Sequence, residues 1–293
     1  MSGHAAGNLR GSLFMVLAMA AFALEDMLYK SVTLALPMGQ GLVLFGVLGM
    51  ALFTLLCVLR GQPPLVAQMW RPGLLLRSGF EVLGRLFFAL ALAFGDLSTT
   101  AAILQALPLA VTLGAVLFLR EAVGWRRWLA IWVGFCGVLL VIRPTTQGVA
   151  PEAIFALLGM VGFAGRDLAT RAAPPSIGNL QLGVLGFGMV ILAGLVLMLA
   201  FGEAPSLPSG RVWGLLIGAA LFGVLAYHAV TVAMRVGQVA VVAPFRYTRL
   251  VFAMGLGALV FGERPDLQTW LGAVLIVGSG LFTLLASARA ARK

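Results

Sequence analysis

Residues 91–121, ALAFGDLSTTAAILQALPLAVTLGAVLFLRE, match residues 233–263, AMRVGQVAVVAPFRYTRLVFAMGLGALVFGE, without a gap at a constant shift of 142 positions. The match continues beyond these segments to Trp128 and Trp270, which stand at the same shift. Chance similarity between two apolar segments does not usually stay in register over such a length. The pattern therefore indicates an internal duplication.

A second block supports the duplication. Residues 14–30 match residues 155–171 at a shift of 141, with Phe, Met, Ala and Asp at equivalent places and a basic residue at the end of each block. Because the two shifts are nearly equal, both blocks belong to one repeat. We predict two copies of the same unit, residues 1–148 and 149–293, joined into one domain.

Composition indicates that this repeat lies in a membrane. Of the residues, 61% are hydrophobic and only 10% are charged, whereas soluble domains carry about 25% charged residues. A segment of ~20 apolar residues spans the bilayer. We predict an all-α polytopic protein with ten transmembrane helices, five in each copy, at residues 12–34, 39–60, 74–94, 97–119, 126–143, 152–171, 179–201, 211–234, 239–261 and 267–287.

The orientation of the two copies follows from their number of spans. Because five is odd, the second copy enters the membrane from the opposite side, so the repeats are inverted. The loop at 120–127 holds three Arg and one Glu, whereas its counterpart at 262–269 holds two acidic residues and one Arg. One set of loops carries twelve cations and the other set four. The positive-inside rule then places both termini in the cytoplasm, in a bacterial inner membrane.

Several functional classes are disfavoured by the residues present. The net charge is +10, but no basic run with interleaved aromatic residues suggests nucleic-acid binding. Cys57 and Cys136 stand alone in apolar segments, and His4 and His228 are the only histidines. We therefore expect no metal, no cofactor and no catalytic residue, and a membrane-embedded transferase is only a minor alternative. The sequence does not indicate an oligomeric state.

Charged residues inside the spans are the main functional signal. Each would cost ~3 kcal/mol at the bilayer centre, so together they require partners or a water-filled interior. These residues are Glu25, Asp26, Glu81, Arg85, Arg166, Asp167, Arg246 and Arg249.

Two of these acids have a basic residue four positions later on the same helix face: Asp26 with Lys30, and Asp167 with Arg171. One interpretation is a pair of structural salt bridges near opposite membrane surfaces. The other is a pair of gates that tighten in different states of a transport cycle. A loss of Asp26 or Asp167 that changed nothing in transport would exclude the gates.

A substrate site is predicted near the centre of the spans. Arg246 and Arg249 are three residues apart, so they share a helix face and could bind a carboxylate. Their counterparts in the first copy are Leu104 and Leu107. The alternative is that these arginines neutralise buried acids. The predicted binding residues are Glu81, Arg85, Gln105, Tyr227, His228, Arg246, Tyr247 and Arg249.

The paired units resemble those of the drug/metabolite transporter superfamily, specifically its EamA-type ten-helix exporters. The resemblance rests on Phe118-Leu119-Arg120-Glu121 with Trp128 and on Val260-Phe261-Gly262-Glu263-Arg264 with Trp270. It covers nearly the whole chain. It implies a central cavity lined mainly by spans 1, 3, 4, 6, 8 and 9.

Within this superfamily the chain looks most like bacterial aromatic amino acid exporters. The resemblance implies export of an amino acid, expected to be aromatic, by alternating access across the lipid bilayer, so the expected partners are this small-molecule substrate and the bilayer itself. The alternative is efflux of other metabolites or of cationic drugs, in which Glu25, Asp26 and Glu81 would matter more than the arginines.

Overall fold

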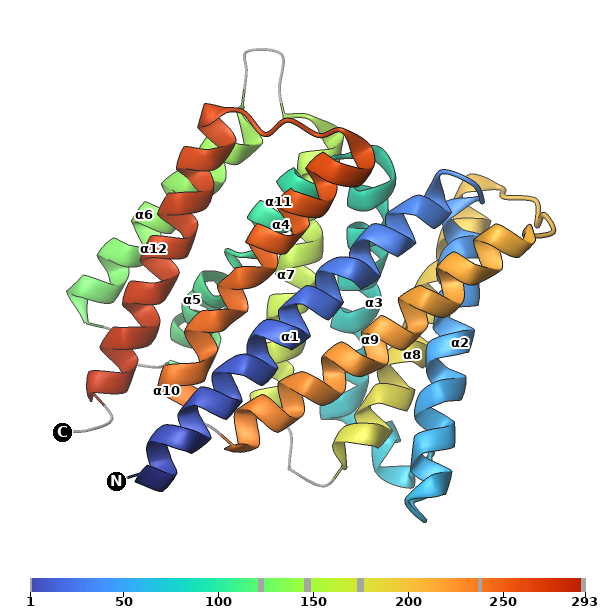
Figure 1. The fold of residues 1–293 in the computed structure, drawn as a ribbon, viewed down its shortest axis with the longest axis horizontal. Coiled ribbons are helices and arrows are strands. Elements are labelled where there is room, and N and C mark those ends of the chain that lie inside the picture. Colours follow the sequence, from blue (N-terminus) through green and yellow to red (C-terminus); the bar gives the residue numbers. More distant parts are fainter. Residues whose placement is uncertain (1, 121–123, 145–148, 173–176, 237–238, 291–293) are drawn as a thin grey trace.

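In the computed structural model, residues 2–120, 124–144, 149–172, 177–236 and 239–290 are described, and every element in these segments is a helix. Figure 1 shows a bundle of steeply inclined helices with both termini at its lower end, which we call the terminal face; the other end is the opposite face. The helices are α1 (Ser2–Thr33), α2 (Met38–Leu59), η1 (Ala67–Trp70), α3 (Pro72–Phe94), α4 (Leu97–Leu104), α5 (Leu107–Leu119), α6 (Trp125–Ile142), α7 (Pro151–Ala172), α8 (Asn179–Phe201), α9 (Gly210–Val236), α10 (Val239–Val242), η2 (Ala243–Tyr247), α11 (Thr248–Phe261) and α12 (Leu267–Ala290).

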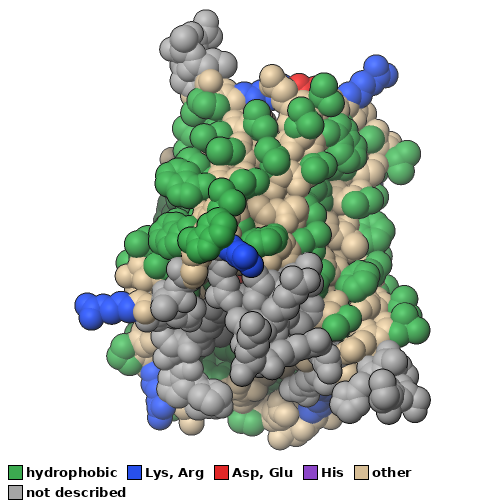
Figure 2. Space-filling model, turned by 90° about the vertical axis from the view of Figure 1, so that its left-hand side faces the viewer, with side chains coloured by type: hydrophobic (Ala, Val, Ile, Leu, Met, Phe, Trp, Pro, Cys, Tyr) green, Lys and Arg blue, Asp and Glu red, His purple; other side chains and the backbone are tan. Residues whose placement is uncertain are grey.

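The helices confirm an all-α membrane protein with ten spans. Five segments are long and apolar enough to cross a bilayer by themselves: Gly7–Thr33, Met38–Leu59, Leu97–Phe118, Asn179–Phe201 and Gly210–Met234. The helices α3 and α7 carry charged residues in their interior, and α6 and α12 have shorter apolar segments. Hydrophobic side chains cover much of the surface shown in Figure 2, where α6 and α12 face the viewer.

The helix pairs display the inverted repeat. In Figure 1, α1 rises from the terminal face, whereas its repeat equivalent α7 starts at the opposite face. α1 packs along α9, and the equivalent pair α7 and α3 packs in the same way. The remaining extensive pairs, α2 with α8 and α6 with α12, each join equivalent helices of the two copies. The predicted boundary at residue 148 lies outside the described residues and stays a prediction.

Two spans that we predicted as single helices are broken near their middle. Residues 97–119 form α4 and α5, and residues 239–261 form α10, η2 and α11. Pro108 and Pro244 stand in the first turn after each break, where a missing N–H group cannot continue the helix. The breaks meet, because the side-chain amide of Gln105 donates a hydrogen bond to the carbonyl oxygen of Arg246, at 3.4 Å. Two interrupted helices therefore adjoin inside the bundle.

Glycines allow α3 and α7 to cross with their backbones in contact. A Cβ atom placed on Gly162 of α7 would lie 2.5 Å from the backbone nitrogen of Gly84 in α3. Gly159 also faces the backbone of α3, with its own Cβ position 3.1 Å from the nitrogen of Phe88. Such contact between backbones is possible only where a side chain is missing.

We predict that Gly162→Ala destabilises the protein, by about 1–3 kcal/mol, because the added methyl group overlaps backbone atoms that cannot rotate away. Thermal unfolding of the purified protein in detergent measures the effect. Gly186→Ala in α8 is the matched control, since no described atom beyond its own stretch of helix lies within 4 Å of its Cβ position, and it should be neutral or slightly stabilising. Equal unfolding temperatures for both variants would contradict the prediction.

Candidate functional site

Glu81 of α3 is the centre of the buried charge network. Its side chain is 3% exposed, and its two oxygens are 3.6 Å from a guanidinium nitrogen of Arg77, 3.3 Å from Nε of Arg85 and 3.3 Å from Nη1 of Arg166. Arg77 and Arg85 lie one turn before and one turn after it on α3, whereas Arg166 comes from α7. One carboxylate thus connects two helices of different repeats.

Asp26 of α1 makes the second connection between repeats. Its Oδ2 atom accepts hydrogen bonds from Nη2 and Nε of Arg249 in α11, at 2.5 and 3.2 Å. The Arg249 guanidinium also lies over the ring of Phe22, 5.1 Å from its centroid. Arg249 therefore neutralises a buried acid, which is the alternative role that the sequence left open.

Arg246 differs from the other arginines of this region. It belongs to η2, at the break of the ninth span, and its side chain is exposed even though it lies in the middle of the chain's passage through the membrane. It interacts electrostatically with Asp167, Arg166 and Arg249. Among the described residues, no carboxylate is within salt-bridge distance of it. Arg246 is therefore the guanidinium that is best placed to bind an outside anion.

We call nine charged residues of spans 1, 3, 6 and 9 the central cluster; all are buried or half-buried except the exposed Arg246. It has five guanidinium groups and four carboxylates, so it carries one excess positive charge when all are ionised. Arg85, Arg166 and Arg249 keep 21–24% of their side-chain surface exposed, and Asp167 keeps 33%. Water can thus reach much of the cluster. Its members are Glu25, Asp26, Arg77, Glu81, Arg85, Arg166, Asp167, Arg246 and Arg249.

The structure corrects the predicted pair of Asp26 with Lys30, whereas the pair of Asp167 with Arg171 stays a prediction. Asp26 binds Arg249 rather than Lys30, and Lys30 instead approaches Glu263, with 3.6 Å between Nζ and Oε1. Asp167 binds its neighbour Arg166, at 2.8 Å. The side chain of Arg171 lies outside the described residues. Four-residue spacing takes no account of partners on other helices. For Asp26 and Lys30, those partners are closer.

The polar residues predicted beside the arginines do not all reach the cluster. Tyr247 is 6% exposed and its hydroxyl group points to α12, where a Cβ atom on Gly280 would be 1.7 Å away. His228 is exposed on the same face of α9 as Leu221 and Leu225, which stand seven and three residues before it. The break at η2 turns Tyr247 away from Arg246, and the register of α9 directs His228 outward.

Tyr227, on another face of α9, remains near the cluster. Its hydroxyl donates a hydrogen bond to the carbonyl oxygen of Asn179, at 2.8 Å, and its ring meets Phe53 edge to face. It interacts electrostatically with Arg77 and Glu81. Tyr227 thus forms part of the wall between α8, α9 and the charged face of α3.

Five residues of the cluster were absent from the predicted binding site: Glu25, Asp26, Arg77, Arg166 and Asp167. Arg77 is 8% exposed and belongs to α3, although its position near the predicted end of the span suggested a loop cation. Arg166 lies over the ring of Phe163 at 5.0 Å, and Arg85 approaches the same ring at 5.7 Å. The signal for Arg77 was present in the sequence, because Arg77, Glu81 and Arg85 have four-residue spacing throughout.

A separate contact, which we call the latch, joins the repeats at the opposite face. Glu263, after α11, accepts hydrogen bonds from the backbone N–H groups of Leu97 and Ser98, at 2.7 and 2.9 Å, and from the Ser98 hydroxyl, at 2.5 Å. These are the first residues of α4, so Glu263 satisfies a helix N-terminus in the other copy. Lys30 adds its ion pair with Glu263 and a hydrogen bond to the carbonyl oxygen of Gly95.

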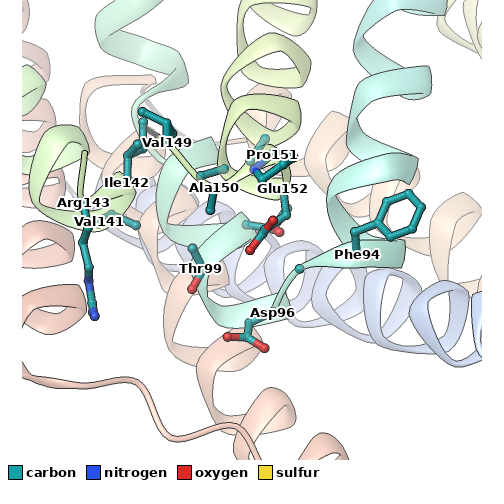
Figure 3. Close-up of a pocket in the computed structure, with 14 residues that line it drawn as sticks. Phe94, Asp96, Thr99, Val141, Ile142, Arg143, Val149, Ala150, Pro151 and Glu152 are labelled. Carbon is teal, nitrogen blue, oxygen red and sulfur yellow. The ribbon is translucent and has the colours of Figure 1, made fainter. Parts of the chain in front are cut away.

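A sizeable cavity lies at the opposite face, away from the central cluster. Its volume is about 540 Å³, and its walls come from the turn between α3 and α4, the end of α6 and the start of α7. Figure 3 shows Asp96, Thr99 and Glu152 together, with Arg143 farther away. Burial raises the pKa of Asp96, the charges of Glu263 and Glu152 raise it further, and Lys30 opposes them. No residue of the predicted binding site lines this cavity.

The family becomes clear from the repeated unit. The model of the EamA-like transporter family matches residues 9–143 and again residues 150–285, once for each inverted copy. The chain belongs to the EamA-like transporter family. It is therefore a small-molecule transporter and not an enzyme.

Relatives within the family differ in what they carry. The chain is 30% identical to a riboflavin transporter of Rhizobium johnstonii, over 97% of this chain and 93% of the relative. It is 27% identical to an S-adenosylmethionine uptake transporter of Rickettsia felis, covering 74% and 72%. It is also 27% identical to the pseudopaline exporter CntI of Pseudomonas aeruginosa, covering 91% and 93%. These names do not support the expected aromatic amino acid.

A solved structure shares the fold of this EamA-like transporter. The crystal structure covers 99% of both chains with a TM-score of 0.60 and 18% sequence identity. This likeness concerns the fold alone.

We predict that Glu81→Gln destabilises this transporter strongly, because three guanidinium groups lose their common carboxylate. Breaking a buried ion pair by removing one partner costs about 3–5 kcal/mol. Thermal unfolding and the monodisperse fraction in size-exclusion chromatography measure it. Glu152→Gln, outside the cluster, should stay close to the wild-type protein, and a Glu81→Gln variant as stable as this control would refute the network.

The latch can be tested separately. Glu263→Ala removes the cap of α4, worth about 1 kcal/mol, and should raise the open population of the opposite face roughly fivefold. The readout is labelling of Thr100→Cys by a membrane-impermeant thiol reagent, because Thr100 is 2% exposed and lies against the cavity. All variants in this experiment also carry Cys136→Ser, because the exposed thiol of Cys136 would otherwise react with the reagent. Arg264→Ala is the control. Equal labelling of Thr100→Cys in the Glu263→Ala and Arg264→Ala variants would show that the latch does not keep the opposite face closed.

Proposed function

We propose that this protein is a secondary transporter that moves a small organic metabolite with an anionic group through the bundle by alternating access. The observation that carries the proposal is Arg246, which has no carboxylate partner among the described residues and stands where two broken spans meet. Transporter sites are commonly built at interrupted helices, because free backbone groups and half-helix ends are available there. The anionic group would bind Arg246 by charge-assisted hydrogen bonds.

The surroundings of Arg246 favour a substrate that also has a flat ring. The ring of Phe163 lies near Arg85 and Arg166, and that of Phe22 lies under Arg249, so aromatic faces accompany the guanidinium groups. Planar rings stack on both kinds of surface. An aromatic amino acid meets this description, but so do larger heterocyclic metabolites. The names of the relatives favour such other metabolites over amino acids.

Membership of the family does not determine the direction of transport. One relative is named for uptake and another for export. We retain a bacterial inner-membrane location with both termini in the cytoplasm, which rests on the distribution of Arg and Lys between the loops. In this orientation the latch closes the outer side.

Counterflow in proteoliposomes tests the proposal. The labelled compounds are riboflavin, S-adenosylmethionine, phenylalanine, tyrosine and tryptophan, each offered to vesicles loaded with the same unlabelled compound. We expect exchange of at least one compound and a binding affinity roughly 10- to 150-fold weaker in Arg246→Gln, because a hydrogen bond to a charged group is worth about 1.5–3 kcal/mol.

The controls separate binding from folding. Arg264→Gln removes an exposed arginine outside the bundle and should leave affinity unchanged. Arg246→Lys keeps the charge but not the fork of donors, so an intermediate affinity is expected. An Arg246→Gln variant that folds and binds as the wild-type protein does would remove Arg246 from the site.

A further inference from the structure

Glu25, in the middle of α1, has a carboxylate oxygen without a donor. The residue is 4% exposed. Its Oε1 atom is 3.7 Å from Nη1 of Arg85, but Oε2 has no hydrogen-bond partner in the described part of the chain. The carboxylate faces α9 at Gly223, where an added Cβ atom would be 3.2 Å from Oε2. The residue that faces Glu25 from α9 therefore has no side chain that could donate.

The other acids of the central cluster have better partners. Glu81 contacts three arginines, and Asp26 receives two hydrogen bonds from Arg249. Asp167 receives two from Arg166, at 2.8 and 2.9 Å. Arg85 is itself closer to Glu81, at 3.3 Å, than to Glu25. Glu25 is thus the least compensated carboxylate of the cluster.

The surroundings of Glu25 contain few other charges. Arg85 faces it from α3, Arg249 acts on it from α11, and Asp26 is the neighbouring acid on α1. The other elements packed around it present Leu42 and Phe45 from α2 and Gly223 from α9, all uncharged. Beside it is a void of about 10 Å³, at the lower limit for a single water molecule. Such a space has room for about one water molecule and cannot hold an organic ligand.

We propose that Glu25 is the proton-binding site that couples transport to a proton gradient. In this step an O–H bond forms on Oε2 of Glu25 with a proton taken from water, and the same bond breaks when the proton returns to water on the other side of the membrane. No other bond changes. The role depends on the proposed transport function, whereas proton binding itself does not.

Protonation would also favour the anionic substrate. It removes the negative charge that faces Arg85, which keeps Glu81 as its acidic partner. The central cluster changes from one excess positive charge to two, so an anionic group entering beside Arg246 is attracted more strongly. Proton and solute then occupy the same state, and the solute is carried in the direction of the proton.

Infrared titration of the purified protein in lipid nanodiscs tests the site without any substrate. As the pH is lowered, the wild-type protein should develop the carbonyl band of a buried protonated carboxylic acid. The band should be absent in Glu25→Gln, shifted in Glu25→Asp and unchanged in Glu152→Gln. A band that persists in Glu25→Gln, or a wild-type protein without one, would overturn the proposal.

A transport measurement tests the coupling. In proteoliposomes with an imposed pH gradient, a compound that exchanges in counterflow should accumulate on the side toward which protons flow, and its accumulation ratio should fall to one in Glu25→Gln. Glu152→Gln should accumulate it as the wild-type protein does. Accumulation against the proton flow, or driven by sodium at equal pH, would overturn the coupling. If no compound exchanges at all, the proposed function fails while the infrared result still decides the proton site.

Discussion

The architecture depends on the neutralisation of charge inside an apolar bundle. A charge at the membrane centre costs ~3 kcal/mol, and a buried carboxylate without a partner is stable only if it is protonated or hydrated. Glu81 satisfies this requirement by gathering arginines from α3 and α7, and Asp26 does so through Arg249. The Glu81–Arg166 and Asp26–Arg249 contacts each join the two repeats. The charges that make membrane insertion costly therefore also determine how the helices of the two repeats associate.

The duplication explains how the helices are arranged, and the residues that differ between the two copies explain the chemistry of the site. The pairs α1 with α9 and α3 with α7 are equivalent, and both central spans are broken at matching places. The side chains at the breaks are not equivalent, because Leu104 and Leu107 occupy the positions that Arg246 and Arg249 have in the second copy. A symmetrical scaffold of this kind can open to either side, whereas a single asymmetric set of side chains gives the solute one place to bind.

The fold followed from the sequence more completely than the site did. Hydropathy located all ten spans, and the repeat shift established their inversion, because both properties belong to local segments and their order. The two breaks, at Pro108 and Pro244, fall inside spans that were predicted as single helices. The partners of Asp26 and Lys30 were predicted wrongly because four-residue spacing describes only one helix. The outward face of His228 and the turn of Tyr247 toward α12 depend on helix rotation and on the geometry of η2, for which neither composition nor spacing has a signal.

The Asp26 to Arg249 contact has a consequence for biogenesis. The two residues are 223 positions apart, so at a translation rate of roughly 5–20 residues per second the acid enters the bilayer about 10–45 s before its partner is synthesised. During that interval the nascent first half must keep Asp26 near water, near lipid headgroups or beside the insertion machinery. The ribosome must therefore nearly complete the chain before Asp26 can pair with Arg249 inside the bundle.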